Sequence, residues 1–246
     1  ISLLSPKVIL SKENITLGTD WRAQAEHGGF YQAKALGLYE DVNLNVFIRQ
    51  GGPQVNHSQL LAAGKIDFGM APNSFIPLNF KSQEIPVKAI AAFFQKDPAV
   101  LISHKSSNFD KIEDLKLSKV MISPDTRIGF WRFLKVRFQF DDSQIAPYTF
   151  NLAPFLANKD AVQQGYITSE PYLIKRSGIE PKVFLLADSG YSSYAGIIQT
   201  RSELINEKPE LIQRFINASI LGWYSFLYDD PNPAFKMILK NNPDMT

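Results

Sequence analysis

The sequence places aromatic and acidic side chains directly after several short apolar runs, where a small molecule could reach them. Trp21 could stack on a planar ring, which contributes roughly 1 kcal/mol beyond the burial of its surface, although a place in the core fits the sequence equally well. Asp20 and Glu170 could accept charge-assisted hydrogen bonds from ring N–H or amino groups. Asp20 could equally cap a helix or form a salt bridge. Together these residues indicate a site for a flat ligand with polar edges.

Tyrosines could supply a second aromatic wall for the same ligand. Tyr172, Tyr191 and Tyr194 lie in or beside predicted loops, although exposed tyrosines in loops are also common without any function. Trp131 differs, because it shares an apolar helical face with Leu134. We therefore expect Trp131 in the core and the tyrosines at the site.

Polar and cationic residues at other strand ends could form further hydrogen bonds or bind an anion. Asn73 and Ser74 could bond to the edge of a ligand, or could cap a helix. Arg127 could bind an anion beside a strand end. His27 begins a predicted helix and could contact the ligand or form a structural hydrogen bond. None of the three histidines pairs with another at metal-ligand spacing, so we expect no metal.

Composition excludes several classes of function. The 246 residues include 26 basic and 24 acidic ones, and a net charge of +2 is too small for binding nucleic acid through bulk charge. Cysteine is absent, which excludes disulfides, thiolate catalysis and iron–sulfur clusters. No apolar run approaches the ~20 residues of a membrane span. The 18 Phe, 9 Tyr and 3 Trp supply ample surface for a folded core.

Short apolar runs alternate with helical segments, a pattern that predicts an α/β fold. In the first half we expect helices over 26–38 and 54–64, ended by Gly37 and Gly64. The expected strands there are 14–20, 44–50, 65–71, 86–94 and 99–104. A second block begins near Ser106, with expected helices at 110–116 and 127–140 and strands at 119–124, 145–151, 161–169, 183–188 and 195–200.

The clearest helix is expected over about 208–229, because apolar residues recur there at helical spacing. The predicted buried face consists of Ile212, Ile216, Ile220, Trp223 and Leu227. This helix follows the second block without a strand of its own to cover, so it must pack on an earlier lobe. The sequence therefore predicts two successive α/β blocks, with the last helices packed on an earlier block.

Four phrases of the sequence, in order, resemble one family of bacterial proteins. They are TDWRAQAEHGGFYQAKALGLYEDVNLNV (19–46), LLAAGKIDFGM (60–70), YITSEPY (166–172) and GWYSFLYDDP (222–231). The chain is similar to solute-binding proteins of ABC importers, in the group for nitrate, sulfonate, taurine, riboflavin and thiamine-pyrimidine precursors. Each phrase alone is a weak signal, whereas four in the same order are specific.

The resemblance implies a two-lobed periplasmic-binding-protein fold of type II, with a ligand cleft between lobes that close by a hinge motion. The implied lobes are 14–104 plus 200–246, and 105–199. Ligands of open α/β lobes bind at the carboxyl ends of strands, where the candidate residues lie. The implied partners are a small-molecule ligand and an ABC permease at the inner membrane, and we expect a monomer without a cofactor. The implied location is periplasmic or membrane-anchored extracellular. Residues 1–10 show no signal-peptide pattern, so we expect that a signal was removed or never existed. The final NNPDMT indicates that C-terminal residues are missing.

The alternative from another class of function is an enzyme of similar fold, the thiamine-pyrimidine synthase of yeast. The resemblance implies that such an enzyme needs a lysine that holds pyridoxal phosphate, a histidine one helical turn later and a cysteine-rich motif. This chain has Ala71 and Phe75 at the two aligned positions and no cysteine. We therefore expect no enzymatic activity.

The choice of ligand depends on the charges of the candidate residues. One tryptophan, three tyrosines and two carboxylates favour a neutral or weakly basic ring, because carboxylates repel anions. A formylaminopyrimidine or hydroxymethylpyrimidine precursor of thiamine fits best, and riboflavin is a close alternative. A sulfonate, taurine or nitrate ligand would instead rely on Arg127 and helix amino ends.

Overall fold

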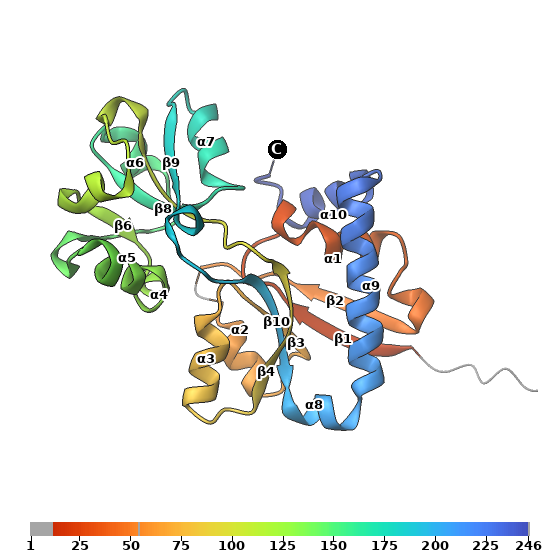
Figure 1. The fold of residues 1–246 in the computed structure, drawn as a ribbon. Helices are drawn as coiled ribbons and strands as arrows, with labels where there is room; N and C mark the ends of the chain where they lie inside the picture. Colours follow the sequence, from red (N-terminus) through yellow and green to blue (C-terminus); the bar gives the residue numbers. More distant parts are fainter. Residues whose placement is uncertain (1–11, 54, 246) are drawn as a thin grey trace, which may run out of the picture. The chain divides into compact units, whose positions relative to one another are not determined.

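The computed structural model describes residues 12–53 and 55–245 (Figure 1). In this part the chain forms two compact units, and each contains one five-stranded sheet. The first unit holds the chain up to Met70, Phe80–Ala91 and the chain from Ile198 onward. The second unit holds Ala71–Asn79 and Ala92–Ile197. The structure therefore confirms the predicted mixed α/β class.

The first sheet has the strand order β2-β1-β3-β10-β4. Strand β1 lies parallel to β2 on one side and to β3 on the other, so the carboxyl ends of these three strands share one edge. Alternating residues of β2 are buried, because one face of this edge strand meets solvent. The strands are β1 (Glu13–Gly18), β2 (Leu44–Arg49), β3 (Phe68–Ala71), β4 (Val87–Phe94) and β10 (Ala195–Arg201).

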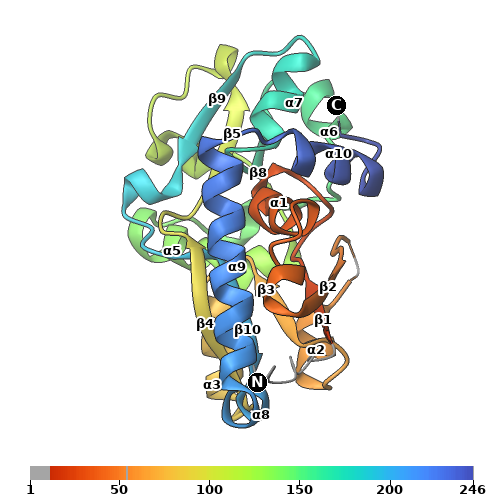
Figure 2. The same cartoon turned by 90° about the vertical axis from the view of Figure 1, so that its right-hand side faces the viewer.

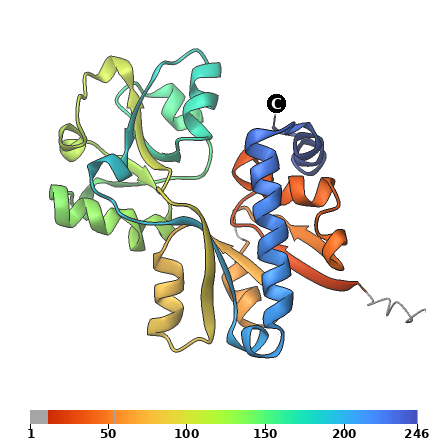
Figure 3. The ribbon, with the colours of Figure 1, turned by 45° about the vertical axis from the view of Figure 1, so that its right-hand side comes forward.

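Helices of the first unit include α1 and α9, which pack closely against each other (Figure 2). Gly222 of α9 is buried, and a Cβ at this position would collide with the Gly29 carbonyl of α1. Helix α10 lies against α1 on another side. Strand β10 leads through α8 into α9, the long blue helix of Figure 3. The helices are α1 (Gly28–Ala35), α2 (His57–Ala62), α8 (Ser202–Glu207), α9 (Pro209–Tyr228) and α10 (Asn232–Asn241).

Two predicted helix ends in the first unit are confirmed by the backbone. Gly37 has a φ of 76° and Gly64 a φ of 68°, left-handed conformations that glycine adopts without strain. The helix expected over 54–64 begins later, at His57, where the Asn56 side chain caps it by accepting from Gln59 N. Gln54, at the expected start, lies outside the described residues, as do residues 1–11.

The second sheet has the order β7-β6-β8-β5-β9 and is covered on both faces. Helix α5 packs on one face through Trp131, which is buried as predicted. Helices α6 and α7 cover the other face through Phe155 and Ile174. The strands are β5 (Ala99–His104), β6 (Val120–Ile122), β7 (Ile145–Pro147), β8 (Val162–Tyr166) and β9 (Pro181–Leu185). The helices are α4 (Pro124–Ile128), α5 (Phe130–Phe138), α6 (Ala153–Ala157) and α7 (Glu170–Arg176); α3 (Phe75–Ser82) has residues in both units.

Three features differ from the sequence-based expectation. Strand β10 lies between β3 and β4, so residues 195–200 belong to the first sheet rather than to the second block. Strand β5 pairs antiparallel with β8 and β9, so residues 99–104 belong to the second sheet rather than to the first block. In α9 the buried residues include Leu211, Phe215 and Gly222, whereas Ile220 and Leu227 of the predicted face are exposed.

Candidate functional site

The loop after β1 carries Asp20 and Trp21, and backbone contacts fix its path. Thr19 Oγ1 donates to the Trp21 carbonyl at 2.7 Å, and Gly51 N donates to the same carbonyl at 3.0 Å. A Cβ at Gly51 would collide with the Thr19 carbonyl, so the loop after β2 can approach this closely only as glycine. The two loops therefore form one rigid edge, which presents the half-buried Trp21.

The side chain of His57 holds the loop after β1 in place through a hydrogen bond and through packing. Its Nδ1 donates to the Thr19 carbonyl at 2.8 Å, and the buried ring fills the space beside Gly18, where a Cβ would lie 2.8 Å from the ring. Burial lowers the pKa of His57, and the bond to Thr19 opposes that shift only in part. The neutral ring therefore acts as a structural donor at neutral pH.

Asp20 and His27 form a pair at the start of α1. Asp20 Oδ1 lies 2.9 Å from His27 Nε2, and the histidine is 2% exposed while its other nitrogen, Nδ1, has no partner among the described residues. Asp20 keeps part of its carboxylate accessible to solvent. The structural bond expected as one role of His27 is present, and Asp20 retains capacity to accept another hydrogen bond.

In the second unit, Ser74 and Tyr194 are joined by a small set of hydrogen bonds. Tyr194 N donates to Ser74 Oγ at 3.1 Å, and Ser74 N donates to Ser193 Oγ at 3.3 Å. Asn73 Oδ1 accepts from Phe75 N at 3.0 Å, which is the helix-capping role considered from the sequence. The Tyr194 ring is 51% exposed beside these groups. Three predicted residues thus gather at one edge of this unit.

Asp97 lies buried behind Ser193 and was not singled out by the sequence. Its carboxylate accepts from Ala99 N at 2.9 Å. Burial raises the pKa of Asp97 to about 6, because removal from water disfavours the charged form. Tyr191 also contacts Ser193, but it is buried in the core of this unit, where burial raises the pKa of its phenol. Tyr191 therefore offers little surface to a ligand.

Glu170 is already bonded within the second unit. Its Oε2 accepts from Tyr166 N at 2.7 Å and its Oε1 from the Tyr148 hydroxyl at 3.2 Å. Burial and the adjacent Glu170 raise the pKa of Tyr148, which stays a donor. Tyr166 in turn donates from its hydroxyl to the Pro72 carbonyl at 3.1 Å. Glu170 is therefore linked through Tyr166 to the segment that carries Asn73 and Ser74.

Arg127 and Tyr172 lie on short helices of the second unit. Arg127 is exposed on α4, whose first turn is fixed by Ser123, Thr126 and the Gln164 side chain. Tyr172 is exposed on α7, with the Arg176 guanidinium 5.7 Å from the centre of its ring. Among the described residues, neither side chain forms a hydrogen bond or an ion pair with Ser74 or Tyr194.

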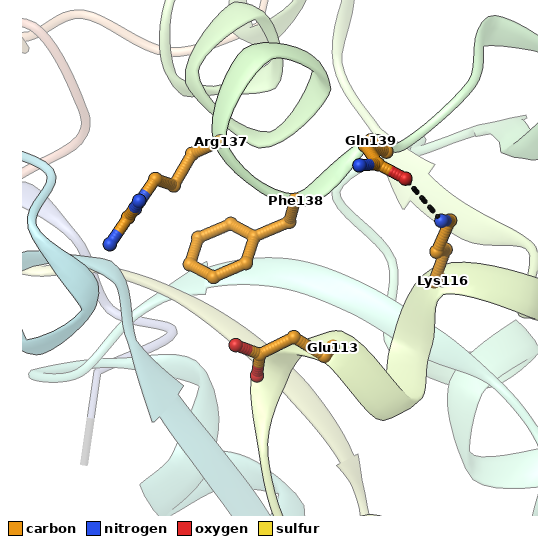
Figure 4. Close-up of a pocket in the computed structure, with 5 residues that line it drawn as sticks. All are labelled: Glu113, Lys116, Arg137, Phe138 and Gln139. Carbon is orange, nitrogen blue, oxygen red and sulfur yellow. Dashed lines mark hydrogen bonds between the residues drawn. The ribbon is translucent and has the colours of Figure 1, made fainter.

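A surface pocket of about 350 Å³ lies elsewhere on the second unit (Figure 4). The Phe138 ring lies between Arg137 and Glu113, and Lys116 donates to Gln139 at 2.8 Å. None of the residues predicted from the sequence lines this pocket.

The described residues give no sign of a metal centre or a membrane span. No group of three histidine or acidic residues among 12–53 and 55–245 has metal-binding geometry. In the same ranges, no helix combines the length and hydropathy needed to cross a membrane.

Comparison with known proteins identifies the family. The sequence profile described as "NMT1/THI5 like" matches residues 24–234, most of the chain. The chain belongs to the NMT1/THI5-like family. The riboflavin-binding protein RibY of Chloroflexus aurantiacus is 21% identical over 98% of this chain and 70% of that protein. The 4-amino-5-hydroxymethyl-2-methylpyrimidine phosphate synthase of Legionella pneumophila is also 21% identical, over 95% of this chain and 75% of that enzyme.

Solved structures agree on the fold of this NMT1/THI5-like protein. The putative periplasmic sulfonate-binding protein SsuA from Methylobacillus flagellatus superposes with a TM-score of 0.65. The match covers 94% of this chain and 74% of the other chain at 14% sequence identity. At this identity the match shows that the two folds are alike and nothing about the ligand. The predicted periplasmic-binding-protein fold is confirmed.

Sequence reasoning missed the residues that hold the candidate site in place. Asp97, Tyr166 and Ser193 are the main ones in the second unit, and His57 in the first. Of these, Asp97 carried a signal, since an acidic residue before Pro98 at the start of a buried strand needs a partner for its charge. The other three gave no signal, because their roles depend on contacts with distant segments.

Proposed function

We propose that this chain is a solute-binding protein of an ABC importer that captures a flat heteroaromatic ligand. The observation that carries the proposal is Trp21, half-buried on a rigid edge beside an acceptor, Asp20, in a chain of the NMT1/THI5-like family. An aromatic face beside a carboxylate fits a ring that carries N–H or amino groups. A thiamine pyrimidine precursor, hydroxymethylpyrimidine or formylaminopyrimidine, has this chemistry.

Riboflavin is the second candidate, favoured by the relative named riboflavin-binding protein RibY. The other relative is named for an aminopyrimidine product, so both names concern flat nitrogen heterocycles. A sulfonate, taurine or nitrate ligand is less consistent with the acidic Asp20 on the first unit. Arg127 is the exposed cation that would serve an anion in the second unit.

The remaining parts of the proposal follow from the family. We propose a monomer in the periplasm or anchored outside the membrane, which delivers its ligand unchanged to a membrane permease and uses no cofactor. The contact residues would be Asp20, Trp21 and His27 in the first unit, and Asn73, Ser74 and Tyr194 in the second, with Arg127, Glu170, Tyr172 and Tyr191 as further candidates from the sequence.

A thermal-shift panel tests the ligand class. The panel contains hydroxymethylpyrimidine, formylaminopyrimidine, riboflavin, taurine and nitrate. A ligand present at 100 times its Kd adds about 2.7 kcal/mol of stability, so a true ligand gives a clear rise in Tm. We expect the two pyrimidines to give the largest rise. A rise with taurine or nitrate alone would overturn the heteroaromatic assignment.

Calorimetry with variants then tests the placement of the site. Trp21→Ala should weaken binding of the responding ligand by roughly 2–3 kcal/mol through lost stacking and apolar contact. Tyr228→Ala is the matched control, because Tyr228 is an exposed aromatic residue at the end of α9. Equal affinities for both variants would show that the ligand does not contact Trp21.

A further inference from the structure

The surface pocket of the second unit contains one cation and one anion that have no partner. The pocket has a volume of about 350 Å³ and lies between the 3₁₀-helix Ile112–Leu117 and the end of α5. Among the described residues, neither the Arg137 guanidinium nor the Glu113 carboxylate forms an ion pair or a hydrogen bond. A pocket of this size holds a small molecule, and its two free charges are of opposite sign.

An aromatic surface separates the two charges. The Phe138 ring lies between Arg137 and Glu113 (Figure 4). Its position is fixed, because the ring packs edge-on against Phe133, with ring centres 5.7 Å apart, and both rings pack on the core of this unit. The Arg137 guanidinium carbon lies 6.0 Å from the centre of the Phe138 ring. A ligand that spans the pocket would therefore lay its apolar part on this ring.

The other two residues that line the pocket bond to each other. Lys116 Nζ donates to Gln139 Oε1 at 2.8 Å. Gln139 ends α5 with a φ of 60°, a left-handed conformation in which glycine is the usual residue. Its side chain is thus retained at a cost in backbone strain, and it engages the Lys116 ammonium. Among the residues that line the pocket, Arg137 is the cation left to bind an anion.

We propose that this pocket binds a linear zwitterion. Its carboxylate pairs with Arg137, its ammonium pairs with Glu113, and its aliphatic chain lies on Phe138. A simple anion or cation would leave one pocket charge unpaired, and the adjacent charges of an α-amino acid cannot reach both sides of an aromatic ring. The class comprises free ω-amino acids and the C-terminal lysine of a peptide. The inference is independent of the proposed function, because none of the candidate ligand-binding residues lines this pocket.

An NMR titration of the wild-type protein tests the ligand class. The Phe138 ring and Gln139 amide signals are followed while 6-aminohexanoate, hexanoate, hexylamine or glycine is added. We expect saturable shifts with 6-aminohexanoate and none with glycine. Hexanoate and hexylamine should bind about two- to fivefold more weakly, because each lacks one exposed ion pair. Equal affinities for these three compounds, or no saturable shift at either residue, would overturn the proposal.

Variants that remove one charge test the two contacts. Arg137→Gln and Glu113→Gln should each raise the Kd of 6-aminohexanoate about two- to fivefold. Arg132→Gln and Asp125→Asn are the matched controls, since they remove exposed charges that do not line the pocket, and they should leave Kd unchanged. The Tm of each variant shows that it is folded. A larger effect of Lys116→Gln than of Arg137→Gln contradicts the contact assigned to Arg137.

An exchange of the two charges separates recognition from a structural role. Glu113→Arg alone and Arg137→Glu alone place like charges on both sides of the ring, and each should abolish saturable binding. The double variant restores one charge of each sign, so 6-aminohexanoate can bind in the reverse direction with a Kd within about fivefold of the wild type. A double variant that binds no better than the single ones would show that the pocket does not recognise the two charges.

Two derivatives of lysine separate the two sources of the zwitterion. N-acetyl-lysine presents its carboxylate and ammonium as a C-terminal lysine does, whereas its amide lacks the carboxylate. Tighter binding of N-acetyl-lysine than of 6-aminohexanoate supports the pocket as a site for a peptide C-terminus, and the reverse order supports a site for a free ω-amino acid. Equal affinities for N-acetyl-lysine and its amide would overturn the contact between a carboxylate and Arg137.

Discussion

The buried carboxyl of Asp97 makes the stability of the protein depend on pH. Its folded-state pKa of about 6 lies above the ordinary value of 3.8, so the folded state holds the proton more tightly. The contribution of this group is complete below about pH 4 and is lost as the pH rises through 6. A shift of this size corresponds to about 3 kcal/mol.

Asp97→Asn should remove this dependence. Between pH 4 and pH 7.5, the free energy of unfolding of the variant should improve relative to the wild type by up to about 3 kcal/mol. Urea unfolding at both pH values measures the difference, and Asp188→Asn, which removes an exposed carboxylate, should show almost no change. A constant difference between variant and wild type would mean that Asp97 ionises normally.

Glu170 gives a second prediction at the scale of a residue. Glu170→Ala leaves Tyr166 N and the Tyr148 hydroxyl without their acceptor, and each orphaned group costs about 1–3 kcal/mol. Glu170→Gln should cost about 1 kcal/mol, since its oxygen can serve Tyr166 N while its amide faces the Tyr148 oxygen, which can also accept. Denaturant unfolding compares the two variants. Equal costs would show that the charge, rather than the acceptor geometry, stabilises α7.

The candidate residues show what sequence reasoning can find at this scale. Asp20, Asn73 and Ser74 were predicted because strand ends collect in an α/β sheet, and each occupies such a junction. The sequence could not reveal that Tyr191 turns into the core or that Glu170 bonds to Tyr148, because both outcomes depend on contacts with segments far along the chain.

At the scale of elements, the contact of α1 with α9 depends on small residues. A Cβ on Gly222 would collide with the Gly29 carbonyl and with Ala33, and the backbone of α1 cannot move aside at little cost. Gly222→Ala should therefore destabilise the protein by about 1–3 kcal/mol, although alanine favours a helix. Thermal unfolding tests this, with Leu221→Ala at the neighbouring exposed position as the control. A stabilised Gly222→Ala variant would mean that the helices can separate.

The same contact explains why the buried face of α9 was predicted only in part, with Ile212 buried as expected and Ile220 and Leu227 exposed. Large apolar residues at helical spacing indicated Ile212, Ile216, Ile220, Trp223 and Leu227. The face that packs closely includes Ala218, Ser219 and Gly222, because close backbone approach requires small side chains. Hydrophobic periodicity detects large residues and misses such an interface, whereas the existence and limits of the helix were predicted to within one residue.

At the scale of the whole molecule, the α/β class and the family were predictable, and the sheets that strands β5 and β10 join were not. The run AVLISH is buried along its whole length, as in any central strand, so its sequence does not show which sheet it enters. Its antiparallel pairing with β8 and β9 depends on residues at least 59 positions away. Four motifs in order, by contrast, identified the family because they sample the whole chain.

The choice between a binding protein and an enzyme also belongs to this scale, since one relative is named as a synthase. The lysine and histidine expected of the related synthase fall at Ala71 and Phe75. Ala71 is buried in β3, and Phe75 stacks on Tyr191 with ring centres 6.4 Å apart. Neither position offers an amine or an imidazole, and the sequence has no cysteine, so a Schiff base at this site has no nucleophile.

We therefore predict that the purified protein returns its ligand unchanged. Mass spectrometry of hydroxymethylpyrimidine, recovered after incubation with protein and pyridoxal phosphate, should show only the starting compound, as with heat-denatured protein. The protein should also carry no bound pyridoxal phosphate by absorbance. Because binding alone requires neither group, the same sample should still show the ligand-dependent rise in Tm. A new pyrimidine product, or pyridoxal phosphate that survives purification, would place this chain with the synthases and would require a lysine elsewhere in the fold to serve as the Schiff-base amine.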